Sequence, residues 1–188
     1  MKLEDYQTII EKTAVYPKEV GIGYTILGLI GESVEFSDVV GETWSLMSIH
    51  IPTADNILAI KKEAGDVCWY ITATCNELSI DVKEVMTGEH PLSPFSKELM
   101  RDLLAAPIEF SAYCAERAKK WLRDGTMNEE IKAEIAGNLR SLYLNVKGMC
   151  QYFGIEMEDV LETNYKKLIK RRETGTLHGS GSNREENQ

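Results

Sequence analysis

Two stretches decide the fold of this chain: residues 27–35, LGLIGESVE, and residues 62–70, KEAGDVCWY. Each lies inside a longer segment in which apolar residues recur about every 3.6 positions, the pattern of an amphipathic helix. Strict alternation of apolar and polar residues, which is typical of a half-buried strand, is hard to find anywhere in the sequence. The chain is therefore predicted to be all-α.

The same periodicity predicts further helices on either side of these stretches. Pro and Gly fall mainly between the periodic segments, as expected for helix ends. We expect helices at about 3–14, 21–48, 53–78, 81–86, 96–123, 128–153 and 156–172. Pro107 should kink or split the helix that contains it, and Gly88 to Pro94 should form a linker.

Length and composition favour one domain, expected at residues 1–172, followed by a Gly/Ser-rich tail at 173–188. The chain has 188 residues and a formal net charge of −9, which disfavours binding to nucleic-acid phosphates. No apolar run is long enough to span a membrane, and the first residues lack the order of a signal peptide. We therefore expect a cytoplasmic protein that binds neither nucleic acid nor membranes.

Two pairs of carboxylates lie on helix faces that should be buried. Glu32 and Glu35 are at i and i+3, and so are Glu63 and Asp66, so each pair is adjacent on one face. Such pairs are common on solvated helices. Here both faces also carry the apolar residues of predicted core stripes, and buried carboxylates need a positive charge nearby.

A hard divalent cation suits this donor set, because it offers oxygen without His or Cys. A diiron carboxylate bundle is the nearest rival, but it normally takes Glu-x-x-His from two of its helices. No glutamate in this chain is followed by His three residues later. We therefore expect Mg²⁺ or Mn²⁺ at these four carboxylates.

The last predicted helix ends in a basic cluster. Five of the residues 166–172 are Lys or Arg, and such charges often only complement the helix dipole. Asn164, Lys167 and Arg171, however, follow each other at i, i+3 and i+7. They line one stripe that could hold a polyphosphate.

These stretches resemble the MazG-like nucleoside triphosphate pyrophosphohydrolases, an all-α superfamily that also includes the dimeric dUTPases. The resemblance rests on residues 5–7 with 13–17, 27–35, 62–70, and 164–168 with 174–184. It covers about 5–86 and 154–184. The last stretch departs from the family's Gly-Ser-Gly-Asp-Asn-Arg ending, because Ser182 replaces the acidic residue.

The resemblance implies a four-helix-bundle core and a reaction in which a (d)NTP and water give the monophosphate and pyrophosphate. Mg²⁺ would be held by Glu32, Glu35, Glu63 and Asp66, and we expect Glu35 to orient or deprotonate the water. Asn164, Lys167 and Arg171 match the family's closing Asn-x-x-Lys-x-x-x-Arg pattern and would contact the phosphates. A homodimer or other small homo-oligomer is expected, and the tail would either cover the site or be disordered.

The residues between the two parts of the resemblance look like a second copy of the first half. Residues 136–138, AGN, echo residues 64–66, AGD, and residues 153–161 echo 78–86. The alignment needs a three-residue shift after Asn138, and it pairs Glu63 with Ile135 and Asp66 with Asn138. A first half at about 1–87 and a degenerate second half at about 96–172 would then form an internally duplicated bundle.

Alternatives stay open. Any two amphipathic helical hairpins have similar sequence patterns, so the alternative is that the apparent repeat arose by coincidence. The chain could also be a catalytically silent helical interaction or regulatory module, although the presence of all four carboxylates argues against lost chemistry. Within the enzyme class, a dUTPase-like or dCTPase-like activity is the alternative, because nothing in the sequence indicates the preferred base or sugar.

Overall fold

The computed structural model describes residues 1–47, 50–88 and 97–177. Within these residues the protein is all-α, with seven α-helices, one short 3₁₀-helix and no strand. The elements are α1 (Leu3–Thr13), η1 (Lys18–Val20), α2 (Gly21–Leu46), α3 (Ala54–Leu78), α4 (Val82–Val85), α5 (Lys97–Asp124), α6 (Glu129–Tyr152) and α7 (Met157–Glu173). The predicted class is confirmed, and every predicted helix end lies within about two residues of the observed one.

Polar side chains explain where the central helices begin. The Thr53 hydroxyl accepts a hydrogen bond from the backbone N–H of Asn56, whose side chain accepts one from the Thr53 N–H, so a capping box opens α3. Asn128 opens α6 by accepting from the N–H of Ile131. Of the two expected effects of Pro107, a kink or a split, the split does not occur, because α5 continues through this residue.

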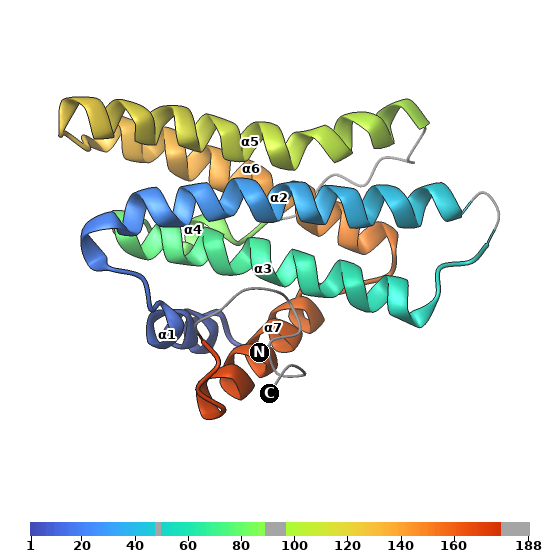
Figure 1. Ribbon diagram of the computed structural model, residues 1–188. Helices are drawn as coiled ribbons and strands as arrows, with labels where there is room; N and C mark the ends of the chain where they lie inside the picture. The colour runs from blue at the N-terminus through green and yellow to red at the C-terminus, as the bar shows by residue number, and fades with distance from the viewer. Residues whose placement is uncertain (48–49, 89–96, 178–188) are drawn as a thin grey trace.

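The helices are stacked in three layers (Figure 1). The antiparallel pair α2 and α3 packs against the antiparallel pair α5 and α6, with α2 on α5 and α3 on α6. These four long helices surround one apolar core whose members include Leu29, Phe36, Ile71, Ile135, Leu142 and Met149, all at zero exposure. Burying each such side chain contributes about 1.5–3 kcal/mol.

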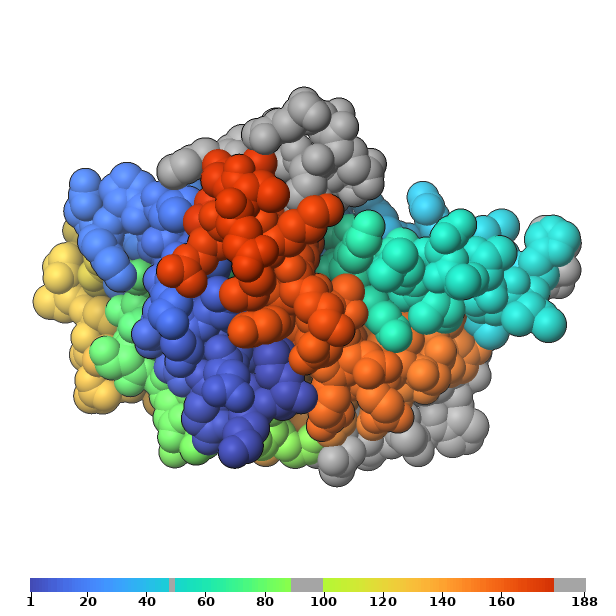
Figure 2. All heavy atoms as spheres, turned by 90° about the horizontal axis from the view of Figure 1, so that it is seen from below, coloured from blue at the N-terminus to red at the C-terminus, as the bar shows by residue number. Residues whose placement is uncertain are grey.

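The third layer consists of α1 and α7, which contact α3 and each other. Figure 2 shows α7 lying beside α1 across this face of the molecule. The packing of α7 on α3 joins parts of the chain that are far apart in sequence. Asn164 and Asp66, for example, are 98 positions apart and share a hydrogen bond.

The segments α3–α4 and α6–α7 repeat the same local geometry. Ala54 begins α3 and Glu129 begins α6, 75 residues apart, each after a polar N-cap. At their other ends, Ser79 and Gly154 adopt the left-handed conformation. The next residues, Ile80 and Ile155, donate their N–H groups to the carbonyls of Cys75 and Cys150, both at 2.9 Å. The two helices therefore end in matching turns as well.

Buried positions follow the same spacing of 75 residues. The matched pairs include Ile60 with Ile135, Ala64 with Leu139, Val67 with Leu142 and Ile71 with Val146. This offset pairs Glu63 with Asn138 and Asp66 with Ser141, without any shift. This offset differs by three residues, about one helical turn, from the pairing that the Ala-Gly dipeptides suggested in the sequence.

The end of α7 differs from the predicted start of the tail. Glu173 is still helical, and the N–H of Thr176 bonds to the carbonyl of Arg171 at 2.8 Å, which closes the helix with a turn. The rest of the predicted tail, residues 178–188, and residues 89–94 of the predicted linker lie outside the described residues. Among the helices of the described parts, none combines the length and the apolar character needed to cross a membrane.

Candidate metal and phosphate site

Three carboxylates from two helices meet beside α7. Glu32 projects from α2, Glu63 and Asp66 project from α3, and one oxygen of each lies within 4.8 Å of the others. The i, i+3 spacing puts Glu63 and Asp66 on one face of α3. The packing of α2 against α3 brings Glu32 to the same place, and all three side chains are partly buried.

Glu35, the fourth predicted ligand, is not part of this group of three. Its side chain is exposed, whereas the sequence pattern predicted that it faces the core. Side chains three residues apart on an α-helix differ in direction by about 60° around the helix axis. Glu35 therefore lies on the solvent side of Glu32. The negative charge of Glu35 nevertheless raises the pKa of both Glu32 and Glu63.

The surroundings make ionisation of these carboxylates unfavourable. Burial is the largest cause that raises the pKa of Glu32 to about 8, followed by the negative charges of its three acidic neighbours. Burial is also the first cause of the raised pKa of Glu63. Lys167 opposes both shifts, because its positive charge favours the ionised carboxylates. The group therefore favours additional positive charge at neutral pH.

Asp66 is held by two side chains from α7. Asn164 donates from Nδ2 to Asp66 Oδ1 at 2.9 Å, and Lys167 Nζ lies 2.6 Å from Oδ2 and also contacts Oδ1. The side chains of Lys167 and Asp66 are only 13% and 22% exposed, so the ion pair is largely shielded from solvent. Two of the three predicted phosphate-binding residues thus lie next to the carboxylates.

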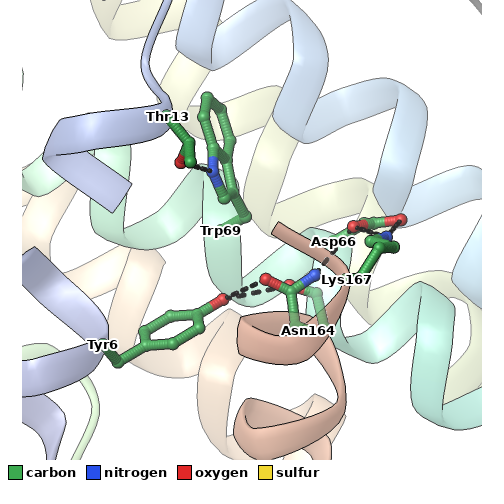
Figure 3. Close-up of polar contacts among 7 residues, drawn as sticks. Tyr6, Thr13, Asp66, Trp69, Asn164 and Lys167 are labelled. Atoms are coloured by element: carbon green, nitrogen blue, oxygen red, sulfur yellow. Dashed lines mark hydrogen bonds and ion pairs between the residues drawn. The ribbon is translucent and has the colours of Figure 1, made fainter. Parts of the chain in front are cut away.

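Tyr6 of α1 extends this network, as Figure 3 shows. Its fully buried hydroxyl donates to Asn164 Oδ1 at 2.9 Å and lies 3.3 Å from the carbonyl oxygen of Gly65. Because the amide oxygen of Asn164 accepts from Tyr6, its nitrogen is directed toward Asp66. Sequence analysis placed Tyr6 only among the residues of the family resemblance, since a contact across 158 positions leaves no local pattern.

Gly65 allows α7 to come this close to α3. A Cβ at position 65 would lie 2.8 Å from the Cβ of Asn164, closer than two such atoms pack. The glycine between two site carboxylates in the 62–70 stretch therefore has a steric role. It leaves the room in which the amide of Asn164 reaches Asp66.

Arg171, the third predicted phosphate-binding residue, lies one turn beyond Lys167. Its side chain is only 8% exposed, whereas the neighbouring Lys170 and Arg172 are exposed. An arginine that only complemented the helix dipole would remain in solvent. The burial of Arg171 is consistent with a stripe that faces inward.

The ring of Tyr70 borders the carboxylates on one side. It packs against α2 at Gly28, where a Cβ would lie 2.1 Å from the Tyr70 Cε1 atom. Burial raises the pKa of Tyr70 well above its usual range, and the charges of Glu32 and Asp66 add to this shift. The phenol is therefore neutral and close enough to sense both carboxylates.

Three further aromatic residues continue from Tyr70 toward solvent. Trp69 packs edge-on against Tyr70 with ring centroids 4.7 Å apart, and Tyr16 stacks on Tyr24 at the same distance. Tyr24 is 45% exposed. Trp69 and Tyr70 pack against the core but are only partly buried, so this aromatic cluster reaches the surface beside the site.

The chemistry of the carboxylate group fits a hard divalent cation. Ligand oxygens around Mg²⁺ lie at about 2.1 Å from the ion, so neighbouring oxygens are about 3–4 Å apart. A spread of 4.8 Å is slightly wider, and small rotations of the two glutamate side chains would close it. Among the described residues, this is the one group of His, Cys, Asp and Glu side chains that converges in this way.

Comparisons with known proteins assign no family. No family model matches the sequence, and no solved structure matches it. A similar protein is the Gene 37 protein of Mycobacterium phage L5, which is 29% identical over 86 residues. The match covers 43% of this chain and 75% of the phage protein, whose name states no activity.

Proposed function

We propose that this protein is an Mg²⁺-dependent nucleoside triphosphate pyrophosphohydrolase with a MazG-like four-helix bundle. The observation that carries the proposal is the group of three carboxylates, Glu32, Glu63 and Asp66, with an ammonium and an amide from α7 beside it. Phosphoryl transfer requires a protein to position a metal ion and to neutralise the charge on the phosphate oxygens. Carboxylates can bind the metal ion, and neighbouring cationic groups can bind the phosphates.

In this proposal each group has a defined task. Glu32, Glu63 and Asp66 hold the metal, which when bound polarises the phosphate oxygens and neutralises their charge. Asn164, fixed by Tyr6, positions Asp66. Lys167, which contacts Asp66, and Arg171, one turn further along α7, would supply positive charge to the phosphates.

Glu35 is proposed to act on water rather than as a primary metal ligand. It is exposed to solvent, while its charge still reaches Glu32 and Glu63. A carboxylate that is not used as a ligand is free to orient or deprotonate the attacking water. Glu35→Gln should therefore lower kcat more than it weakens metal binding.

The aromatic cluster supports a nucleotide as the substrate. Tyr70 borders the carboxylates, and Tyr24 and Tyr16 continue the cluster to the surface. Flat aromatic rings favour stacking with other rings such as a nucleobase. A dUTPase-like or dCTPase-like preference is the alternative within this enzyme class.

An internally duplicated bundle is part of the proposal. The constant spacing of 75 residues between α3 and α6 supports it, and Asn138 and Ser141 stand where Glu63 and Asp66 stand in the first half. Each chain would then carry one metal cluster, while the second half serves as scaffold. We expect a homodimer or other small homo-oligomer, with Mn²⁺ able to replace Mg²⁺.

The test is pyrophosphate release from a panel of (d)NTPs with Mg²⁺. The wild type should release pyrophosphate from at least one nucleotide, and Glu63→Gln should be slower by about 100-fold or more. Glu130→Gln, an exposed position on α6, is the matched control and should be unaffected. If no nucleotide is cleaved, the protein is better explained as a catalytically silent helical module.

A further inference from the structure

We propose that Lys167 serves as the counter-ion of the three clustered carboxylates in the metal-free protein. Its ammonium competes with a divalent cation for Asp66, and it moves to the substrate phosphates when the cation binds. This inference rests on the proposed function and specifies how the site changes between its free and its loaded state. It would make cation and triphosphate bind as coupled partners rather than independently.

The contacts of Asp66 are the first observation. Lys167 Nζ contacts both carboxylate oxygens, so it lies where a cation shared by those oxygens would lie. Asn164 uses only Oδ1, and its bond to Asp66 is compatible with a cation on Oδ2. Two positive charges cannot share one carboxylate face without repulsion, so the ammonium has to leave before a metal ion takes its place.

The second observation is that Lys167 and Asn164 differ in how firmly they are held. Asn164 is 1% exposed and is fixed by the Tyr6 hydroxyl. Lys167 retains some exposure, and its ammonium is a point charge on a flexible four-carbon stem. The ammonium can therefore swing away from Asp66 while the amide stays in place.

The third observation is the charge left behind. The charge of Lys167 also acts on Glu32 and Glu63, so it partly neutralises the whole group in the metal-free protein. When a metal ion provides that neutralisation, the ammonium loses its partner. A triphosphate on the metal offers it a new one, because phosphate oxygens accept charge-assisted hydrogen bonds from lysine. Removing Lys167 should then strengthen metal binding and weaken nucleotide binding.

The experiment measures Mn²⁺ binding by calorimetry in the wild type and in Lys167→Met, first without nucleotide. The variant should bind Mn²⁺ about tenfold more tightly, or better, because one charge-assisted hydrogen bond no longer has to be broken. Lys166→Met removes the same charge from the exposed side of α7 and should leave Mn²⁺ affinity unchanged. Adding an α,β-methylene dNTP should tighten Mn²⁺ binding more in the wild type than in Lys167→Met.

The outcomes separate this inference from the proposed function. The inference is overturned if Lys167→Met binds Mn²⁺ no more tightly than the wild type. The proposed metal site is still supported in that case, provided that Glu63→Gln abolishes Mn²⁺ binding. If the nucleotide analogue increases the Mn²⁺ affinity of the wild type and of Lys167→Met by the same factor, the proposed transfer of the ammonium to phosphate is overturned. Absence of Mn²⁺ binding in every protein, with or without the analogue, refutes the metal site and the inference together.

Discussion

At the scale of single residues, Glu32 has a pKa far above the usual value of a carboxylate. It comes from a different helix than Glu63 and Asp66, and burial is the main reason why its pKa rises to about 8. The folded, metal-free protein thus favours the neutral form of a residue that is ionised above about pH 4.5 when the chain is unfolded.

This shift predicts how stability depends on pH without metal. A raised carboxylate pKa contributes stability that is fully present below the unfolded pKa and is lost as pH rises through the folded value, here from about 4.5 to about 8. Between pH 6 and pH 8 in EDTA, the wild type should lose on the order of 1 kcal/mol more free energy of unfolding than Glu32→Gln. Urea denaturation at both pH values measures this, and equal losses in the two proteins would show that Glu32 ionises like a surface carboxylate.

At the scale of helices, the glycines of α2 show how close packing positions the site. Gly28 faces the ring of Tyr70 on α3, while Gly31, three residues later, has no atom within 4 Å of where its Cβ would be. The same residue type therefore has opposite roles on one helix. Gly28 permits the approach of α2 and α3, and Gly31 only lowers the helix propensity.

Substituting these two glycines separates packing from propensity. Gly28→Ala should destabilise the protein by about 1–3 kcal/mol, because the Tyr70 ring has to move and repack. Gly31→Ala should stabilise it by up to about 1 kcal/mol, because alanine is the better helix former and meets no neighbour. Thermal unfolding of both variants tests this, and a stabilising Gly28→Ala would show that the ring is not held against α2.

At the scale of the whole molecule, α5 and α6 cover α2 and α3 as a second subunit would. The helix α5 packs on α2 and α6 packs on α3 over one shared core, and α6 repeats the N-cap, the closing turn and the buried positions of α3. If the proposed duplication is correct, these apolar faces of α2 and α3 depend on α5 and α6 for their cover.

Deleting this cover tests the duplication. Joining Met86 to Glu156 through a short linker removes α5 and α6, and the exposed faces of α2 and α3 should cause aggregation or pairing with a second chain. Light scattering would then report insoluble protein or twice the parent's subunit number. A soluble, active protein with the parent's subunit number would contradict the duplication, because it would mark the segment as a dispensable insertion.

The sequence by itself determined the helices and part of the site. Caps such as Thr53 and Asn128 and the 3.6-residue period act over a few residues, so they specify where each helix begins, where it ends and which residues share a face. The pairing of Glu63 with Asp66 on one face of α3 follows from spacing alone. The basic stripe on α7 was predicted in the same way.

Only the tertiary structure decided which of these faces meet. The rotation of each helix about its axis depends on how side chains from distant segments interlock, and no local pattern records this. Packing thus brought Glu32 to α3, left Glu35 in solvent, and put Asn164 and Lys167 on Asp66 with Tyr6 behind them. It also gave α3 and α6 matching closing turns 75 residues apart, an offset that differs by three residues from the one the Ala-Gly dipeptides suggested.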